Sequence, residues 1–201
     1  MAIYEFADNQ IKKLARTTFS ERGIRERHDL QRLLREQIEI IASDTMVLAE
    51  EFGDWDESRR RIDLLCLDKA ANIVLIELKR TEDGGHMELQ SLRYAAMVSN
   101  MTFEQAVHAH DEFLKDIGSD LSAEDNILEF LGWTEDGPDE DSFAQDVRIV
   151  LASASFSKEL TGSVLWLNDK GIDIRCVKME PFYDGQRTLL DIQQVIPLPE
   201  A

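Results

Sequence analysis

Two neighbouring apolar runs constrain the fold of this chain more than any other part of its sequence. Residues 62–67 read Ile-Asp-Leu-Leu-Cys-Leu, and residues 73–79 read Ile-Val-Leu-Ile-Glu-Leu-Lys. Runs this short, dominated by aliphatic side chains and bounded by polar residues, are typical of strands. The polar residues between them, Asp-Lys-Ala-Ala-Asn, suit the connection of a hairpin. The sequence therefore predicts two antiparallel strands joined over residues 68–72.

Helical and strand patterns alternate along the rest of the chain. Apolar residues at steps of three and four predict helix from about residue 11 to 42, and a stretch without Gly or Pro predicts another from 86 to 100. The other expected elements are a strand at 45–52, further helix within 104–146, a strand at 147–152, a helix at 157–167, a strand at 172–179 and an apolar tail at 189–195. Turns are expected at Gly53-Asp54, Asp83-Gly-Gly and 136–141. This alternation predicts an α/β fold.

Composition supports one globular domain spanning residues 1–201. The chain is 43% hydrophobic and 31% charged, which is enough apolar surface to bury a sizeable core. The N-terminus lacks a basic region followed by an apolar stretch, and no segment has the run of about 20 apolar residues that spans a bilayer. Cys66 and Cys176 lie in separate apolar runs without zinc-site spacing, so we expect reduced core thiols. We therefore expect a soluble, cytoplasmic protein with no membrane partner.

The formal net charge of −18 argues against a protein that coats nucleic acid by neutralising its phosphates. The acidity is local, however. Residues 1–100 hold 15 Lys and Arg against 19 Asp and Glu, whereas residues 101–201 hold 7 against 21. Within 104–146, fourteen acidic residues accompany one basic residue, Lys115. We expect an acidic, largely helical segment at about 101–146, either a solvated helical face or a DNA-mimicking or regulatory surface.

The hairpin places three charged residues on one face if its loop is centred on Ala70. Asp63 then lies opposite Glu77, and Arg61 lies opposite Lys79. Because side chains alternate with a period of two, Asp63, Glu77 and Lys79 project to the same side. A slip of one residue in the register would separate them.

This group of side chains suits metal-assisted phosphodiester chemistry. Asp63 and Glu77 are flanked by apolar residues, and a buried carboxylate needs a partner. Two converging carboxylates suit Mg²⁺ or Mn²⁺, which take oxygen ligands and retain water. Such a metal polarises a phosphodiester and activates a bound water, while Lys79 would orient that water or offset negative charge.

A third oxygen ligand is expected from the strand before the hairpin. Glu50 and Glu51 are both candidates. Neighbours on a strand point to opposite faces, so only one of them should reach the site. We favour Glu51.

Polar residues on the following helix are candidates for substrate contacts. Gln90 and Tyr94 are four residues apart and share a helix face, with Arg93 nearby. Amide, phenol and guanidinium groups can contact phosphate oxygens or an unstacked base. Arg61, the last residue of the basic run 59–61, is a further candidate for holding phosphate.

Three motifs in this order resemble a known family. Ile62-Asp63, Glu77-Leu78-Lys79 and Gln90-Ser-Leu-Arg-Tyr94 are similar to the motifs of the PD-(D/E)XK nuclease superfamily, in the branch that carries QxxxY. Ile62 stands where the superfamily's name has Pro. The similarity is greatest to NucS-like endonuclease domains, and it covers roughly residues 26–100, with a weaker match at 147–179.

The resemblance implies a mixed central β-sheet flanked by helices, with a core like that of restriction endonucleases. It implies cleavage of DNA with Mg²⁺ or Mn²⁺, including single-stranded, branched or damaged DNA as substrates. Asp63, Glu77 and the backbone carbonyl of Leu78 would be metal ligands, and Lys79 would be the catalytic lysine. Gln90 and Tyr94 would lie near the scissile strand.

Other interpretations stay open in the sequence. The charged residues of the hairpin could form an ordinary cross-strand ion pair. The chain could be a non-catalytic module of nuclease fold that binds a protein or nucleic-acid partner, or a nuclease for RNA. A homodimer also stays open as a partner. His108 and His110 diverge if they lie on a helix, so we expect both at the surface.

Overall fold

The computed structural model describes residues 2–198 except 8, 54–60, 81–85, 134–138 and 140. Its strands are β1 (Tyr4–Ala7), β2 (Gln10–Lys13), β3 (Ala15–Arg16), β4 (Thr45–Phe52), β5 (Ile62–Asp68), β6 (Ile73–Lys79), β7 (Val147–Ser153), β8 (Ile174–Tyr183) and β9 (Thr188–Ile196). Its helices are the π-helix η1 (Glu26–Gln31), α1 (Arg32–Glu36), the 3-10 helix η2 (Ile38–Ile40), α2 (Met87–Val98), α3 (Phe103–Asp116), α4 (Ala123–Leu131) and α5 (Lys158–Asn168). No helix within these described ranges is long and apolar enough to cross a membrane.

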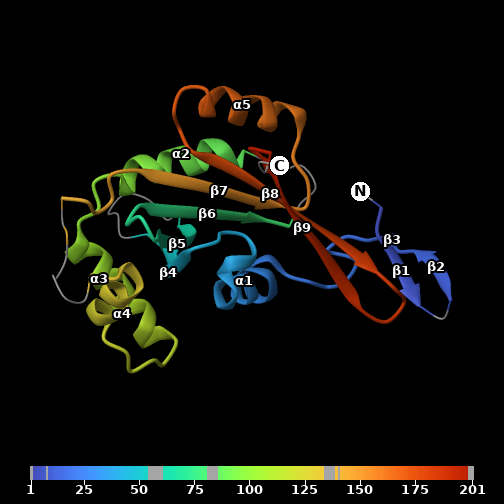
Figure 1. Cartoon of the computed structure of the whole chain (residues 1–201), viewed down its shortest axis with the longest axis horizontal. Coiled ribbons are helices and arrows are strands. Elements are labelled where there is room, and N and C mark those ends of the chain that lie inside the picture. Colours follow the sequence, from blue (N-terminus) through green and yellow to red (C-terminus); the bar gives the residue numbers. More distant parts are fainter. Residues whose placement is uncertain are drawn as a thin grey trace.

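A mixed β-sheet forms the centre of the molecule (Figure 1). Within the described residues it has seven strands, in the order β3-β8-β7-β6-β5-β4, with β9 paired to β8. The neighbours β6, β7 and β8 run parallel, and the other pairs run antiparallel. In Figure 1, α2 and α5 lie on one side of the sheet and α1 lies on the other. The expected mixed sheet flanked by helices is therefore confirmed.

Each face of the sheet carries its own apolar core. On one face, Leu65 and Leu75 belong to a cluster that includes residues of α2 and α5. On the other face, Leu64 and Ile76 belong to a cluster that includes residues of η1 and α1. Every residue of β5 is buried as a result. This explains why the two runs are continuously apolar, because strands covered on both faces show no alternation.

The hairpin of β5 and β6 has the register that the sequence predicts. Leu64 pairs with Ile76, and Leu67 pairs with Ile73. The loop is closed by Asp68, whose Oδ1 accepts hydrogen bonds of 2.9 Å from the backbone N–H groups of Ala70 and Asn72. A short carboxylate that binds the backbone two residues ahead stabilises a tight turn. Local chemistry therefore sets the register of this hairpin.

The N-terminal region corrects the prediction of helix from residue 11. Strands β1 and β2 form a separate antiparallel hairpin, and helix begins only at Glu26. Within this hairpin, Phe6 lies opposite Ile11, and both side chains are largely exposed. The spacing of apolar residues from residue 11 onward suited a helix face, but pairing with β1 makes residues 10–13 a strand instead. The expected turns at Gly53-Asp54, Asp83-Gly-Gly and 136–141 fall wholly or mostly outside the described residues.

Helix α3 is attached to the edge strand β4 through His110. This residue is 3% exposed, and its Nδ1 donates to the backbone carbonyl of Leu48 over 3.1 Å. Its Nε2 lies 3.3 Å from Oδ1 of Asn126 in α4. The expectation that His110 lies at the surface is wrong, whereas His108 is exposed. Burial lowers the pKa of the His110 imidazole, so this histidine is neutral in the folded chain near neutral pH.

We expect His110 to make the fold less stable as the pH falls from about 7.5 to about 5.5, an interval that spans the ordinary histidine pKa. Because the pKa of folded His110 is lowered, the unfolded chain binds the proton first, and acidification favours unfolding. Urea unfolding at both pH values should show a smaller loss of stability for His110→Gln than for the wild type. The exposed control His108→Gln should follow the wild type. An equal loss in His110→Gln and wild type would contradict this expectation.

Candidate active site

Asp63, Glu77 and Lys79 lie together where β5 and β6 separate from their paired region. Asp63 is 8% exposed, and Glu77 has no exposed surface. The hydrogen-bonded ladder extends only as far as Leu64 and Ile76. Beyond it, Oδ2 of Asp63 accepts a hydrogen bond of 2.7 Å from the backbone N–H of Leu78. The hairpin therefore brings the three predicted side chains into one group.

Glu77 is the most buried charged group of this site. Its Oε1 lies 3.0 Å from Nζ of Lys79 and accepts a hydrogen bond of 2.8 Å from Nε2 of Gln90. Its Oε2 has no hydrogen-bond partner among the described residues. Nζ of Lys79 also lies 3.8 Å from Oε1 of Glu26 in η1. One carboxylate oxygen of Glu77 is thus satisfied, and the other is buried without a partner.

The two carboxyl groups resist ionising together. Burial raises the pKa of Glu77 to about 7, and the neighbouring Asp63 charge adds to this increase, while Lys79 opposes it. Burial also raises the pKa of Asp63 to about 6 against the hydrogen bond from Leu78. For Lys79, burial lowers the pKa, but the charges of Glu77 and Asp63 outweigh this and leave a raised pKa. A further cation would favour the ionised form of both acids.

The donor set of this site fits a hard divalent cation with only part of its coordination supplied by protein. Asp63 and Glu77 offer carboxylate oxygens, and the unpartnered Oε2 of Glu77 is an acceptor in need of a positive group. In the described part of the chain, no group of three or more His, Cys, Asp or Glu side chains is arranged to hold a metal ion. Mg²⁺ commonly binds one or two carboxylates and keeps several waters. The residues present therefore fit an Mg²⁺ ion that keeps several waters better than a metal ion held entirely by protein ligands.

Strand alternation predicted that Glu50 and Glu51 point to opposite sides of β4, and the structure contradicts this. Both carboxylates contact one amide: Nε2 of Gln31 donates to Oε1 of Glu50 over 3.0 Å and to Oε1 of Glu51 over 3.1 Å. Glu51 has a left-handed backbone with φ of 51°, which breaks the alternation. The charge of Glu51 also contributes to the raised pKa of Asp63, after the larger effect of burial. Glu51 nevertheless does not join Asp63 and Glu77 in a group of three acidic side chains that could hold a metal ion within the described residues, so its role as a third ligand stays a prediction.

One face of η1 and α1 supports this acidic pair, and its residues are not among those that the sequence motifs single out. Arg27, Gln31 and Arg35 are spaced four residues apart. Arg27 pairs with Glu51 over 3.0 Å, and Arg35 pairs with Glu50 over 2.6 Å. Nε2 of Gln31 also lies 3.3 Å from the backbone carbonyl of Asp63. The sequence feature that could have identified these three residues is their four-residue spacing, which places polar side chains on one helix face.

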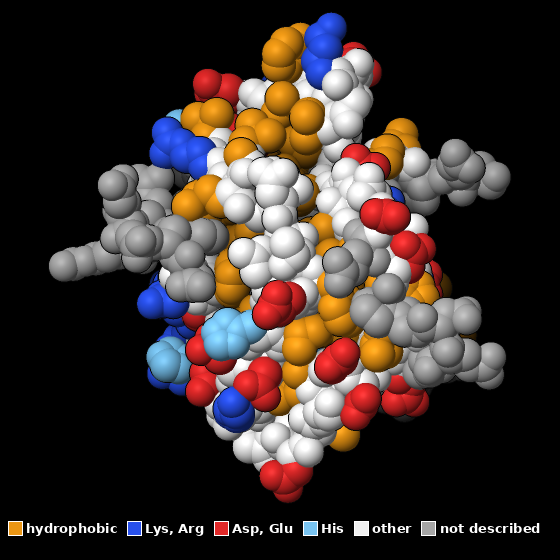
Figure 2. All heavy atoms as spheres, turned by 90° about the vertical axis from the view of Figure 1, so that its left-hand side faces the viewer, with side chains coloured by type: hydrophobic (Ala, Val, Ile, Leu, Met, Phe, Trp, Pro, Cys, Tyr) orange, Lys and Arg blue, Asp and Glu red, His pale blue; other side chains and the backbone are white. Residues whose placement is uncertain are grey.

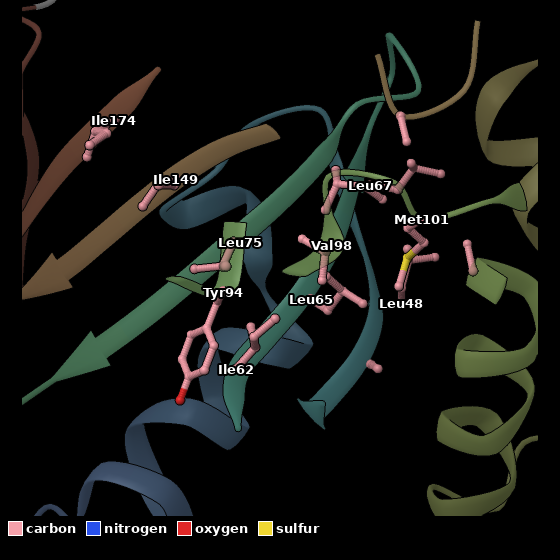
Figure 3. Close-up of a cluster of buried hydrophobic side chains, with 14 of the residues drawn as sticks. Leu48, Ile62, Leu65, Leu67, Leu75, Tyr94, Val98, Met101, Ile149 and Ile174 are labelled. Carbon is pink, nitrogen blue, oxygen red and sulfur yellow. The ribbon is translucent and has the colours of Figure 1, made fainter. Parts of the chain in front are cut away.

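Gln90 contacts Glu77 directly, and Tyr94 contacts Gln90. Nε2 of Gln90 donates both to Glu77 and, over 3.2 Å, to the hydroxyl of Tyr94. Tyr94 is 2% exposed, and its ring lies beside Ile62, Leu65 and Leu75 (Figure 3). Gln90 therefore orients Glu77, and Tyr94 lies behind Gln90 rather than at the surface. This burial does not favour the predicted contact between Tyr94 and substrate.

The two predicted arginines lie at the surface. Arg61 is exposed, and its Nη1 donates to the backbone carbonyl of Glu51 over 3.0 Å. This contact keeps Arg61 near the acidic pair. Arg93 is exposed on α2. The other two residues of the basic run 59–61 fall outside the described residues.

Three solved structures are similar to this chain, each with a TM-score below 0.5. A complex of EndoMS with double-stranded DNA has a TM-score of 0.41 and 19% identity, covering 74% of this chain and 43% of that one. A repair endonuclease from Pyrococcus abyssi has a TM-score of 0.38 and 16% identity over 88% of this chain and 65% of its own. EndoMS in apo form has a TM-score of 0.38 and 15% identity over 84% and 49%. The present chain thus spans less than two thirds of each.

No family model matches the sequence. No curated protein matches it either. Likenesses at TM-scores near 0.4 do not establish an activity, so function has to be inferred from the residues of the site.

Proposed function

We propose that this protein is a divalent-metal-dependent nuclease that hydrolyses DNA phosphodiester bonds. The observation that carries the proposal is Glu77, a fully buried carboxylate beside Asp63 and Lys79 whose Oε2 has no partner among the described residues. A buried oxygen of this kind needs a positive group. Asp63 and Glu77 are the metal ligands in this proposal, and Glu51 and the backbone carbonyl of Leu78 are candidates for further oxygen ligands.

An ordinary ion pair does not account for this arrangement. Cross-strand ion pairs at a surface contribute about 0–1 kcal/mol and stay solvated. Here two carboxyl groups are buried next to each other, and the pKa of each is raised by that burial. Keeping two such acids costs stability unless a cation binds them. This loss of stability favours a role of Asp63 and Glu77 in binding a cation over a purely structural role.

Each residue of the site has a distinct task in the proposed reaction. Bound Mg²⁺ or Mn²⁺ would supply Lewis-acid polarisation of the phosphodiester and a water of lowered pKa. Lys79, which stays protonated because its pKa is raised, orients the attacking water or offsets negative charge on the phosphoryl oxygens. Gln90 holds the Oε1 atom of Glu77 through its 2.8 Å hydrogen bond. Arg61 and Arg93 are exposed and available to phosphate groups of the substrate.

Titration with Mn²⁺ together with a cleavage screen tests the proposal. Wild-type protein should bind Mn²⁺ and cleave at least one of single-stranded, branched or mismatched DNA. Asp63→Asn should weaken Mn²⁺ binding by about 10–100-fold or more, because it removes a ligand charge. Asp173→Asn is the matched control, since this exposed aspartate pairs with Arg148 and Arg175 before β8 begins. Equal Mn²⁺ binding by the wild type and Asp63→Asn would overturn the metal assignment.

A second candidate function is a non-catalytic module of the same fold. The net charge of −18 favours it, because this charge repels nucleic acid. Such a module needs no Mn²⁺ at Asp63 and cleaves none of the DNA forms. Cleavage of RNA but not DNA in the same screen would instead assign the site to RNA.

A further inference from the structure

A trough with an apolar floor runs along α3, and its first part lies between α3 and the C-terminal end of α2. Its first part has a volume of about 470 Å³ and is lined by Phe52, Met97, Met101, Glu104 and Glu112, among others. Met97 is 46% exposed although it is a large apolar side chain. Figure 2 shows acidic side chains distributed around apolar ones on this side of the molecule. An acidic face of α3 that only kept the protein hydrated would not require exposed apolar side chains beside it.

The trough continues toward the candidate active site. A second hollow of about 580 Å³ shares Phe52, His108 and Glu112 with the first and extends to Glu50 and Glu51. The two hollows therefore form one path along α3. A ligand that filled this path would end beside the acidic pair.

The charge of the trough restricts what can occupy it. Its α3 wall presents Glu104, Glu112 and Asp116, and the sequence segment 104–146, which includes most of α3, holds fourteen acidic residues. The one basic residue of that segment, Lys115, is already paired with Asp111. Near the site end, the guanidinium of Arg35 is paired with Glu50, and the exposed Arg61 donates to the backbone carbonyl of Glu51. A nucleic acid is repelled by this wall, and so is a second copy of a chain with net charge −18.

We propose that this trough binds a basic amphipathic helix of a partner protein. The apolar face of the helix would pack on Phe52, Met97 and Met101, and its Lys and Arg side chains would pair with Glu104 and Glu112. Helices that bind in grooves use this combination of an apolar stripe and flanking charges. Methionine side chains adapt to a bound apolar surface. The proposal assigns a role to the acidity that the nuclease function leaves unused.

Fluorescence anisotropy with two labelled peptides tests the proposal. One probe is an amphipathic Lys/Leu peptide of about 18 residues with helical periodicity, and the other is a scrambled peptide of the same composition. Wild-type protein should bind the amphipathic peptide at least about tenfold more tightly than the scrambled one, since only the former presents one apolar face. Equal binding of the two peptides would mean that only unspecific charge attraction is present, which would overturn the proposal.

Charge reversal locates the binding surface. The double variant Glu104→Lys/Glu112→Lys should weaken binding of the amphipathic peptide by about tenfold or more. The matched control, Glu124→Lys/Glu129→Lys, makes the same change of net charge on α4, outside both hollows. Equal weakening by both double variants would contradict the assignment of the trough as the binding site of the peptide. Thermal unfolding checks that each variant folds.

Two further measurements identify the occupant. Displacement of the amphipathic peptide by single-stranded DNA of about 20 nucleotides, or concentration-dependent dimerisation that excludes the peptide, would reject the helix as occupant in favour of DNA or a second copy. The experiment is independent of the proposed nuclease function, because it is done without metal and repeated with Asp63→Asn. Loss of cleavage with intact peptide binding, or the reverse, separates the two proposals.

Discussion

The Glu77→Gln variant is expected to lose metal-dependent DNA cleavage by on the order of 10³-fold, with its fold intact. Glutamine has the shape of glutamate, and its amide oxygen can still accept the hydrogen bonds from Gln90 and Lys79. Its amide nitrogen replaces the Oε2 atom that has no partner among the described residues. The substitution therefore removes the charge and a metal-binding oxygen while it keeps the packing.

Initial rates of DNA cleavage over a range of Mn²⁺ concentrations measure this effect. Thermal unfolding without metal should give a melting temperature as high as that of the wild type, because the variant no longer buries this charge. Glu180→Gln is the matched control: it removes a largely buried carboxylate of the same sheet that pairs with Arg16 and Lys178. The control should keep most of the wild-type activity. Cleavage at the wild-type rate by Glu77→Gln would exclude Glu77 as a catalytic residue.

Leu75→Ala is expected to lower the free energy of unfolding by about 2–5 kcal/mol. Leu75 is fully buried in the middle of β6, and its neighbours across the sheet are Leu65 on β5 and Ile149 on β7. Figure 3 shows the side chain of Leu75 within the cluster that also holds Tyr94. Because strands on both sides and helix α2 above prevent collapse, the truncation leaves a cavity.

Urea unfolding of wild type and variant measures the loss in stability. Leu165→Ala on α5 is the control, because Leu165 is 54% exposed and its truncation removes little buried surface. The control should change the free energy of unfolding by less than about 1 kcal/mol. A loss below that amount for Leu75→Ala would mean that the β5–β6 hairpin is not the centre of the core.

Local patterns were sufficient for the hairpin and for the group of three charged residues. The register of Leu64 with Ile76 follows from the apolar runs and from the loop that Asp68 closes. Once this register is set, alternation places Asp63 and Glu77 on one side. The spacing of Gln90 and Tyr94 similarly predicted a shared helix face, and the two side chains are hydrogen-bonded to each other.

Local patterns failed where the partner is distant in sequence. His110 lies in an acidic, polar stretch, yet it is buried, and its two ring nitrogens contact the carbonyl of Leu48 and the side chain of Asn126. Residues 11–16 have apolar spacing that suits a helix, but they form parts of β2 and β3, and β3 pairs with the far strand β8. Propensity is a weak determinant when a tertiary partner is available.

The sequence by itself determined the hairpin, its register and the identity of Asp63, Glu77 and Lys79 as one group, because these depend on contacts within the single hairpin of residues 62–79. The alternation of helical and strand patterns also predicted the α/β class, whereas the parallel pairing of β6 with β7 joins residues as distant as Ile73 and Val147. Only the tertiary structure decided that Gln31 holds Glu50 and Glu51 together, that Oε2 of Glu77 is buried without a partner among the described residues, and that an apolar floor accompanies the acidic face of α3. Burial and long-range hydrogen bonding arise when separate elements pack against each other, and a periodic pattern in one segment does not specify its partner.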